Sequence, residues 1–386
     1  FYYKTFMWPK SFWYKVYEPF IRKAAGLGVA SIKHDKERYE HKYEYCDLLV
    51  AGSGPSGLAS AYAAAKNGAR VILAEDKPRF GGSLLTSEVN IGNQSGKEWA
   101  DNIISELKEM PNVIVKNRSQ VFGYYDHNML VMSEKLSDHL PKTKKYNPKQ
   151  RLWYIRAKEV VISSGSIERP LVFGNNDTPG VMLSSAAKEY LKVYGVLVGK
   201  KPLIFTNNDS GYETAIEFKK NGVDPVVLDT RKELKSEIID EAKKLNIQIK
   251  FSYVVVAAKG YKKVKSAEVA KISDDKKKLG ALENINCDCI CVSGFWTPTI
   301  HLASQSGNKT TFNKDIDAFV PGLSKQNETT LGAANGTFTL EETLKKSFES
   351  GYELSKKITK NENKTSTPTV MEKKSTTHDK FWCVPL

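Results

Sequence analysis

Residues 48–57, LLVAGSGPSG, constrain the fold of this chain more than any other stretch of its sequence. An apolar run leads into Gly52, Gly54 and Gly57, whose spacing matches the dinucleotide-binding fingerprint. In that fingerprint the first glycine permits a tight turn, the second lets backbone N–H groups approach a pyrophosphate, and the third lets the next helix pack closely on the sheet. The N-terminus of that helix faces the phosphates with its partial positive charge. The sequence therefore predicts a strand, a turn and a helix that together bind a dinucleotide.

The flanking sequence favours this interpretation over a chance glycine turn. The alanine-rich segment 58–66 contains mainly good helix formers, and Asn67-Gly68 ends it. A second apolar strand, 70–74, ends at Glu75, 18 residues after Gly57. A carboxylate at this place accepts hydrogen bonds from the adenosine ribose and disfavours a 2′-phosphate. We therefore expect the loop to prefer NAD or FAD over NADP.

A second strand–turn–helix–strand unit follows at residues 203–229, but its turn has lost the glycines. Asn207, Asn208 and Asp209 put side chains, one of them anionic, where a pyrophosphate would need bare backbone. We therefore expect this unit to have the dinucleotide-binding fold but to lack the usual contacts with a dinucleotide.

Two short strands that end in small residues, 160–165 and 291–294, frame the second unit. We interpret the chain as an α/β protein with two dinucleotide-binding domains, Rossmann-like and of the glutathione-reductase type, the second inserted in the first. The predicted parts are an aromatic-rich lead-in (1–44), a discontinuous NAD-binding domain (45–180 and 286–358), the inserted domain (181–285) and a linker (359–386). A predicted helix at 340–357 either turns a second N-terminus toward the same cofactor or is an ordinary helix start.

The net charge of +14, from 58 Lys and Arg against 44 Asp and Glu, would suit nucleic acid or an acidic partner. Much of the excess lies in scattered lysines and in two polar segments, 142–151 and 356–374, without a basic helix or an RNA-binding signature. We therefore expect no nucleic-acid partner. We expect no membrane span either, because no apolar run approaches about 18 residues. Phe1 is not an initiator methionine and no signal peptide follows it, so we expect the sequence to begin inside a longer protein.

The five cysteines include no CxxC pair, so the redox-active pair of disulfide reductases is not expected. Cys287, Cys289 and Cys291 recur with a period of two, which places them on one face of a strand. A buried strand face is favoured over a metal or iron–sulfur site, which would want a turn-spaced pair. Reduced thiols are consistent with the cytoplasm. We predict no metal site and no catalytic residue, because His127 and His301 lack a spacing that would make either of them a base.

Several longer motifs carry a family resemblance. They are YKTFMWPKSFWYKVYEPFIRKAAGLG (3–28), VFGYYDHN (121–128), SGSIERPLVFGNNDTPGVMLSSAAKEYL (164–191), FTNNDS (205–210), SGFWTPTIHLASQSG (293–307) and AFVPG (318–322). Together they resemble the alpha subunit of heterotetrameric sarcosine oxidase over residues 1 to about 355. Opine and proline dehydrogenase subunits share the fold but match these motifs less fully.

The resemblance implies an enzyme that oxidises sarcosine to glycine, reduces oxygen to hydrogen peroxide, and releases formaldehyde or transfers the one-carbon unit to tetrahydrofolate as 5,10-methylenetetrahydrofolate. It implies beta, gamma and delta partner subunits, with FAD and covalently held FMN mainly in the beta subunit. The alpha subunit is expected to hold NAD in a structural or regulatory role. A C-terminal folate-binding domain is missing from this sequence, so the fragment alone is expected to be inactive.

The predicted cofactor-binding residues come from two sources. The resemblance assigns the grip on NAD to Ser56, Glu75, Asp76, Lys77, Ser83, Val121, Ala333 and Phe338. The residues themselves add Gly52, Gly54, Gly57, Gly82 and Gly165. Gly82 and Ser83 offer unhindered backbone and a hydroxyl for a phosphate or ribose, or they form an ordinary turn after Pro78.

Three hypotheses remain open from the sequence. The leading one is the NAD-binding part of a sarcosine oxidase alpha subunit. The second is a subunit of another amine, opine or proline dehydrogenase, or a stand-alone FAD-dependent oxidoreductase. The third is a scaffold or nucleic-acid-binding module that has lost its cofactor. Ten of the first twenty residues are aromatic, and we expect these rings to pack on the core of this chain or on a partner subunit.

Overall fold

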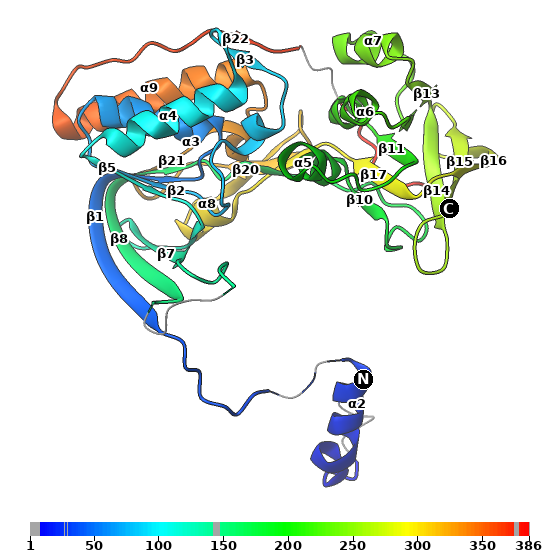
Figure 1. The fold of residues 1–386 in the computed structure, drawn as a ribbon, viewed down its shortest axis with the longest axis horizontal. Helices are drawn as coiled ribbons and strands as arrows, with labels where there is room; N and C mark the ends of the chain where they lie inside the picture. The colour runs from blue at the N-terminus through cyan, green and yellow to red at the C-terminus, as the bar shows by residue number, and fades with distance from the viewer. Residues whose placement is uncertain (1–7, 27, 29, 142–146, 374–377, 386) are drawn as a thin grey trace.

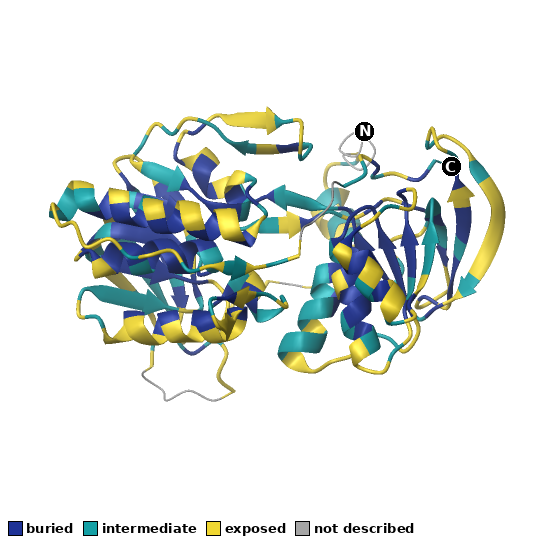
Figure 2. Ribbon diagram, turned by 90° about the horizontal axis from the view of Figure 1, so that it is seen from above, coloured by how far each residue is buried: buried dark blue, intermediate teal, exposed yellow. Residues whose placement is uncertain are grey.

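The computed structural model describes residues 8–26, 28, 30–141, 147–373 and 378–385. Two sheets carry the fold, each in a domain of its own (Figure 1). Figure 2 shows the sheets as buried layers beside helices whose outer faces are exposed. The predicted α/β architecture of two dinucleotide-binding domains is confirmed.

The first sheet has the strand order β5-β2-β1-β8-β7-β6, and β21 also pairs with β8. Its strands are β1 (Tyr39–Ala51), β2 (Val71–Ala74), β5 (Val113–Lys116), β6 (Ser119–Tyr125), β7 (Met129–Lys135), β8 (Gln150–Ile162) and β21 (Glu328–Thr330). β5, β2, β1, β8 and β21 are parallel, whereas β6 and β7 run antiparallel at the end of the sheet. β21 returns to this sheet after the last strand of the second sheet, β17 (Cys289–Ser293).

Both faces of the first sheet are covered, which explains the continuous apolar run of β1. Leu48 and Val50 face the helices α3 (Pro55–Lys66), α4 (Gly96–Glu109) and α9 (Leu340–Thr359). Leu49 and Ala51 face the opposite cluster, to which β6, β7 and α8 (His301–Gln305) contribute. Figure 1 shows the three helices stacked over one side of the sheet.

Small residues let α9 lie directly on α3. A Cβ on Gly351 of α9 would lie far inside contact distance of the Ser60 carbonyl oxygen, and 2.8 Å from Ser60 Cα. The hydroxyl of Ser347 donates to Ser56 Oγ at 3.1 Å across the same contact. The last helix is thereby fixed on the helix that follows the glycine loop.

The second sheet is entirely parallel, in the order β10-β17-β11-β12-β13. Its strands are β10 (Val181–Leu183), β11 (Pro202–Thr206), β12 (Val226–Asp229), β13 (Gln248–Phe251) and β17 (Cys289–Ser293). One face packs on α5 (Ser184–Tyr194), α6 (Ser210–Lys220) and α7 (Glu237–Lys244). The other packs on an antiparallel sheet of β14 (Tyr253–Lys259), β15 (Ser266–Ile272) and β16 (Leu279–Asn286).

The position of β17 refines two expectations from the sequence. The predicted part 286–358 would place this strand in the first domain, but it pairs with β10 and β11 of the second sheet; the domain boundaries themselves stay a prediction. Cys289 and Cys291 do share one buried face, as predicted. Cys287 lies in the cluster on the opposite face, because it precedes the strand and the period of two does not extend to it.

Short elements lie outside the main sheets. They are β3 (Asn90–Ile91), β4 (Gln94–Ser95), β9 (Ser166–Glu168), β18 (Trp296–Pro298), β19 (Thr310–Asn313), β20 (Ala318–Pro321), β22 (Val370–Met371) and the 3-10 turns η2 (Gly82–Leu85) and η3 (Gly332–Asn335). The C-terminal segment, red in Figure 1, runs from α9 to β22, which pairs with β3, and ends against the second domain.

The described part of the aromatic lead-in forms a short π-helical turn, η1 (Trp13–Tyr17), and α2 (Glu18–Ala24). Figure 1 shows α2 apart from both domains. Trp8, Tyr14 and Phe20 are 81%, 80% and 74% exposed, so this chain's core does not bury them. Among the helices of the described residues, none is long and apolar enough to cross a bilayer.

The contact between α3 and α9 predicts the effect of Gly351→Ala. The added methyl group would meet main-chain atoms of Ser60, which cannot rotate away, so the helices must separate. We expect a net loss of about 1–3 kcal/mol in the free energy of unfolding, although alanine favours helices. Urea denaturation of the variant and of the unsubstituted chain measures this loss in the free energy of unfolding. Gly280→Ala is the control, because a Cβ there makes only ordinary contact with Lys271, and an equal loss in both variants would contradict the packing argument.

Candidate nucleotide-binding site

The three glycines of the loop after β1 have different surroundings. A Cβ on Gly57 would collide with the carbonyl oxygen of Gly52, and a Cβ on Gly52, whose φ is +103°, would collide with that of Ser163. A Cβ on Gly54 would meet nothing within 4 Å. The first and third glycines are therefore required by the protein's own packing, whereas the second leaves room on the open side of the loop.

The N-terminus of α3 begins at this open side. Gly54 is its N-cap residue and makes no side-chain capping bond, Pro55 takes the first position, and the first turn contains no acidic residue. Uncapped N–H groups and the helix dipole favour an anion at such an end. The arrangement is that of a phosphate-binding helix N-terminus.

Glu75, at the end of β2, is buried directly beside the loop. Its Oε2 accepts hydrogen bonds from the N–H and the hydroxyl of Ser53, at 2.9 and 2.6 Å, and its Oε1 accepts one from the N–H of Lys77 at 3.0 Å. Burial raises the pKa of Glu75 above its ordinary value, and the contact with Asp76 adds to this, while the bonds from Ser53 and Lys77 oppose it. A carboxylate has about four lone-pair sites, so these bonds leave capacity to accept from a ribose hydroxyl.

Residues 81–83 fold onto the same loop. The N–H of Gly81 donates to the carbonyl of Ser53 at 3.0 Å. A Cβ on Gly82 would lie 2.8 Å from the Cα of Gly54, and Ser83 beside it is exposed. Gly82 and Ser83, predicted from the sequence as cofactor-binding residues, therefore lie next to the glycine loop.

The side chain of Ser56 turns away from the open side. It is buried, with its hydroxyl 3.1 Å from those of Ser163 and Ser347. A Cβ on Gly332 of η3 would lie 2.8 Å from Ser56 Cβ, so η3, which includes Ala333, packs behind the loop. If Ser56 contacts NAD as predicted, it must do so through its main chain, because its hydroxyl faces the protein interior.

Three further predicted residues, Val121, Gly165 and Phe338, come from other segments of the chain. Val121 is near the Glu75 end, because the N–H of Ser119 on the same strand donates to the carbonyl of Glu75 at 2.7 Å. Gly165 follows β8, with open space where a Cβ would be. Phe338 packs edge-on against Phe295, with ring centroids 5.2 Å apart.

The two residues after Glu75 point outward. Asp76 is exposed. The ammonium group of Lys77 pairs with Glu189 of α5 at 2.9 Å, and thus ties the site to the second domain. The contact between Lys77 and Glu189 was not evident from the sequence, since Glu189 lies 112 residues further along.

The second helix N-terminus that the sequence offered, that of α9, is already occupied. The N–H groups of Leu340 and Glu341 donate to the two carboxylate oxygens of Glu372, at 2.9 and 3.0 Å. These amides are not open to a phosphate, so the alternative of an ordinary, capped helix start applies. A separation of about thirty residues between helix and cap gives no local sequence signal.

Comparison with known proteins agrees with this geometry. The family model of pyridine nucleotide-disulphide oxidoreductases matches residues 46–319. The chain belongs to this family.

Two similar proteins indicate to which members of the pyridine nucleotide-disulphide oxidoreductases this chain is related. Sarcosine oxidase subunit alpha of Rhizobium meliloti (strain 1021) is 41% identical over 345 residues, which cover 87% of this chain and 33% of the relative. That of Corynebacterium sp. (strain P-1) is 34% identical over 317 residues, or 81% and 33%. The resemblance to sarcosine oxidase alpha subunits is confirmed, and the chain spans about a third of the length of these curated relatives.

A solved structure shows the same fold. L-proline dehydrogenase from P. horikoshii superposes with a TM-score of 0.61 at 19% identity, covering 85% of this chain and 57% of that one. At this identity the likeness concerns the fold alone.

The family description refers to a disulphide, but the cysteines of this chain form none. All five cysteines are free, and four are buried. Burial raises the pKa of Cys287 to about 12, and the charges of Cys289 and Asp288 add to this, so the thiolate is scarce at neutral pH. Within the residues that the structure describes, no three His, Cys, Asp or Glu side chains gather to hold a metal ion.

The different surroundings of the glycines predict different costs of substitution. Gly57→Ala should lower the free energy of unfolding by about 2–3 kcal/mol, because the methyl group would overlap the backbone of Gly52. Gly54→Asn should change it by less than about 0.5 kcal/mol, because asparagine is a good N-cap residue and its side chain enters open space. Chemical denaturation of both variants tests this, and a large loss in Gly54→Asn would refute the assignment of the open side.

Proposed function

We propose that this chain is the NAD-binding part of a sarcosine oxidase alpha subunit. The enzyme would oxidise sarcosine to glycine with oxygen as acceptor, forming hydrogen peroxide together with formaldehyde or 5,10-methylenetetrahydrofolate. One observation carries the proposal: the open, uncapped N-terminus of α3 lies beside the buried Glu75 in a chain that is 41% identical to such a subunit over most of its length.

In this proposal the pyrophosphate of NAD is held by the backbone at Gly54 and the first turn of α3. Glu75 accepts from the adenosine ribose, and its negative charge disfavours a 2′-phosphate. Gly82 and Ser83 flank the loop, Val121 lies toward the adenine, and Ala333 lies behind the loop. NAD would supply redox capacity when bound, and we propose that its role in this chain is structural or regulatory.

The chemistry would be completed by other parts of the assembly. FAD and FMN would be held mainly with the beta subunit, gamma and delta subunits would complete a heterotetramer, and tetrahydrofolate would bind a further domain of the alpha subunit. The exposed rings of Trp8, Tyr14 and Phe20 suit burial against a partner subunit, because large apolar surfaces seldom stay in water. Free cysteines fit a cytoplasmic enzyme.

A second candidate is a subunit of another amine, opine or proline dehydrogenase. The shared fold with L-proline dehydrogenase supports it. A stand-alone FAD-dependent oxidoreductase is the remaining possibility, since the same loop and carboxylate serve FAD.

The experiment that tests the proposal is identification of the bound cofactor. The purified chain is denatured, and the released small molecules are identified by absorbance and mass spectrometry. NAD without flavin supports the proposed function. Stoichiometric FAD would overturn it and make the chain a flavoprotein of its own.

A negative charge introduced at the open side of the loop should weaken the binding of NAD. Gly54→Asp keeps a good N-cap residue but places an anion where the pyrophosphate would lie, and Gly54→Asn is its uncharged match in size. We expect Gly54→Asp to weaken NAD binding by roughly 100-fold or more, and by clearly more than Gly54→Asn, because charge repulsion adds to the loss of space. Isothermal titration calorimetry measures the affinity of both variants for NAD. Equal affinities of Gly54→Asp and Gly54→Asn would exclude a pyrophosphate at this loop.

A further inference from the structure

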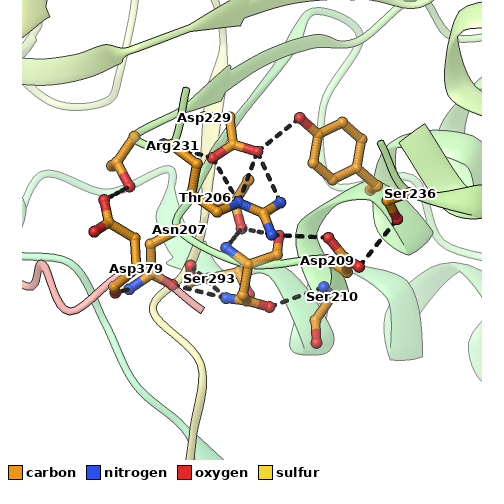
Figure 3. A network of polar contacts seen from close by, with 12 residues as sticks. Thr206, Asn207, Asp209, Ser210, Asp229, Arg231, Ser236, Ser293 and Asp379 are labelled. Carbon is orange, nitrogen blue, oxygen red and sulfur yellow. Dashed lines mark hydrogen bonds and ion pairs between the residues drawn. The ribbon is translucent and has the colours of Figure 1, made fainter. Parts of the chain in front are cut away.

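Residues 378–384 cross the carboxyl end of the second parallel sheet. Figure 3 shows Asp379 of this segment beside Asn207, which directly follows β11, and beside the polar cluster around Arg231. In an open α/β sheet, ligands bind outside the carboxyl ends of the strands, where the strand order reverses. Here that point lies between β11 and β17, because the chain proceeds from β11 to β12 on one side and places β17 on the other. The segment lies where a second nucleotide would be expected.

The loop after β11 forms hydrogen bonds with the main chain of this segment. Asn207 Nδ2 donates to the carbonyl oxygens of Asp379 and Phe381, at 2.9 and 3.0 Å. The carbonyl oxygen of Asn207 in turn accepts from the N–H of Asp379 at 2.9 Å. The asparagine that replaces the first glycine of the fingerprint is therefore bonded to peptide groups, and its side chain is fully buried.

Neighbouring loops add side-chain contacts. The hydroxyl of Thr230, after β12, donates to Asp379 Oδ2 at 2.8 Å, and Lys276 forms an ion pair with the same oxygen at 2.8 Å. The indole N–H of Trp382 donates to the carbonyl of Gly294, after β17, at 3.1 Å. Loops after three neighbouring strands thus hold one short segment.

The same segment contributes to the apolar core of the second domain. Phe381 and Val384 are 6% and 2% exposed and belong to the cluster that contains Phe205 and Leu228. Two main-chain bonds join it to Val172, from the N–H of Val172 to the carbonyl of Trp382 and from the N–H of Val384 to the carbonyl of Val172. This burial is that of a core element, not of a solvated linker.

The charges behind the segment oppose a pyrophosphate. Arg231 is buried between Asp209 and Asp229, with ion pairs of 2.9 and 2.8 Å. The hydroxyl groups of Ser236 and Tyr212 donate to Asp209 and Asp229, at 3.1 and 2.8 Å. With two carboxylates on one guanidinium, the cluster has a net negative charge, and its cation is already engaged.

We propose that the carboxyl edge of the second sheet is a peptide site whose ligand is this chain's own segment 378–384, and that it excludes a second nucleotide. The chain then has one dinucleotide site, at Gly54, and its second domain serves to hold the C-terminal segment. Upstream, β22 pairs with β3 and Glu372 caps α9, so the same stretch of chain is fastened to both domains.

Hydrogen exchange with mass spectrometry on the whole chain tests the proposal. In the unsubstituted chain, we expect peptides covering 378–384 to be protected to a similar degree as β11.

The double variant Asp379→Ala/Phe381→Ala should exchange roughly tenfold faster or more in 378–384 and in the loop 205–210, because the buried ring and the ion pair are lost. Peptides from α3 should keep their protection. Cys383→Ser is the matched control, since Cys383 is exposed in the same segment, and it should exchange as the unsubstituted chain does.

Nucleotide stoichiometry is the second readout. Equilibrium dialysis of the unsubstituted chain against NAD and against NADPH should show no more than one nucleotide per chain. Two nucleotides per chain, or free exchange of 378–384 in the unsubstituted chain, would overturn the proposal even if the variants failed to fold. These results are separate from the cofactor-release experiment, because FAD in place of NAD at Gly54 would leave the exchange of 378–384 unchanged.

Discussion

The close approach of α3 to the end of β1 is the contact on which the rest of the site depends. It exists because Gly57 lies against the carbonyl of Gly52, and Gly52 against that of Ser163, with no room for a Cβ at either glycine. This approach brings the first turn of α3 beside Glu75 and gives η3 and α9 a surface on which to pack. The same close contacts at Gly52 and Gly57 therefore fix both the geometry of the nucleotide loop and the packing of the first domain.

The C-terminal residues add to this arrangement by occupying two further places, the N-terminus of α9 and the carboxyl edge of the second sheet. Glu372 supplies a carboxylate to the N-terminus of α9, and residues 378–384 cover the carboxyl edge of the second sheet. The N-terminus of α3 is left without a side-chain cap. The two domains therefore share an architecture but differ in what lies at the ends of their strands.

Much of this could be predicted because its causes are local. The spacing of Gly52, Gly54 and Gly57, followed by a strand that ends in Glu75, predicts both the loop and its acidic neighbour. The loss of glycines at residues 207–209 predicts a second domain without the usual contacts to a nucleotide, and the structure shows that the side chains at these positions are buried in the turn. The assignment of Cys287 to the face of Cys289 failed because periodicity does not show where a strand begins.

The sequence by itself determined the two-domain α/β fold, the phosphate-type loop and the position of its carboxylate, because each depends on residues within one strand–turn–helix unit. Only the tertiary structure decided which of these features face a ligand. The Ser56 hydroxyl is turned inward by Ser347, 291 residues away, and Asn207 is bonded to Asp379 and Phe381, more than 170 residues away. Hydrogen bonds between such distant residues leave no periodic pattern in a chain, since they depend on how the helices and sheets pack.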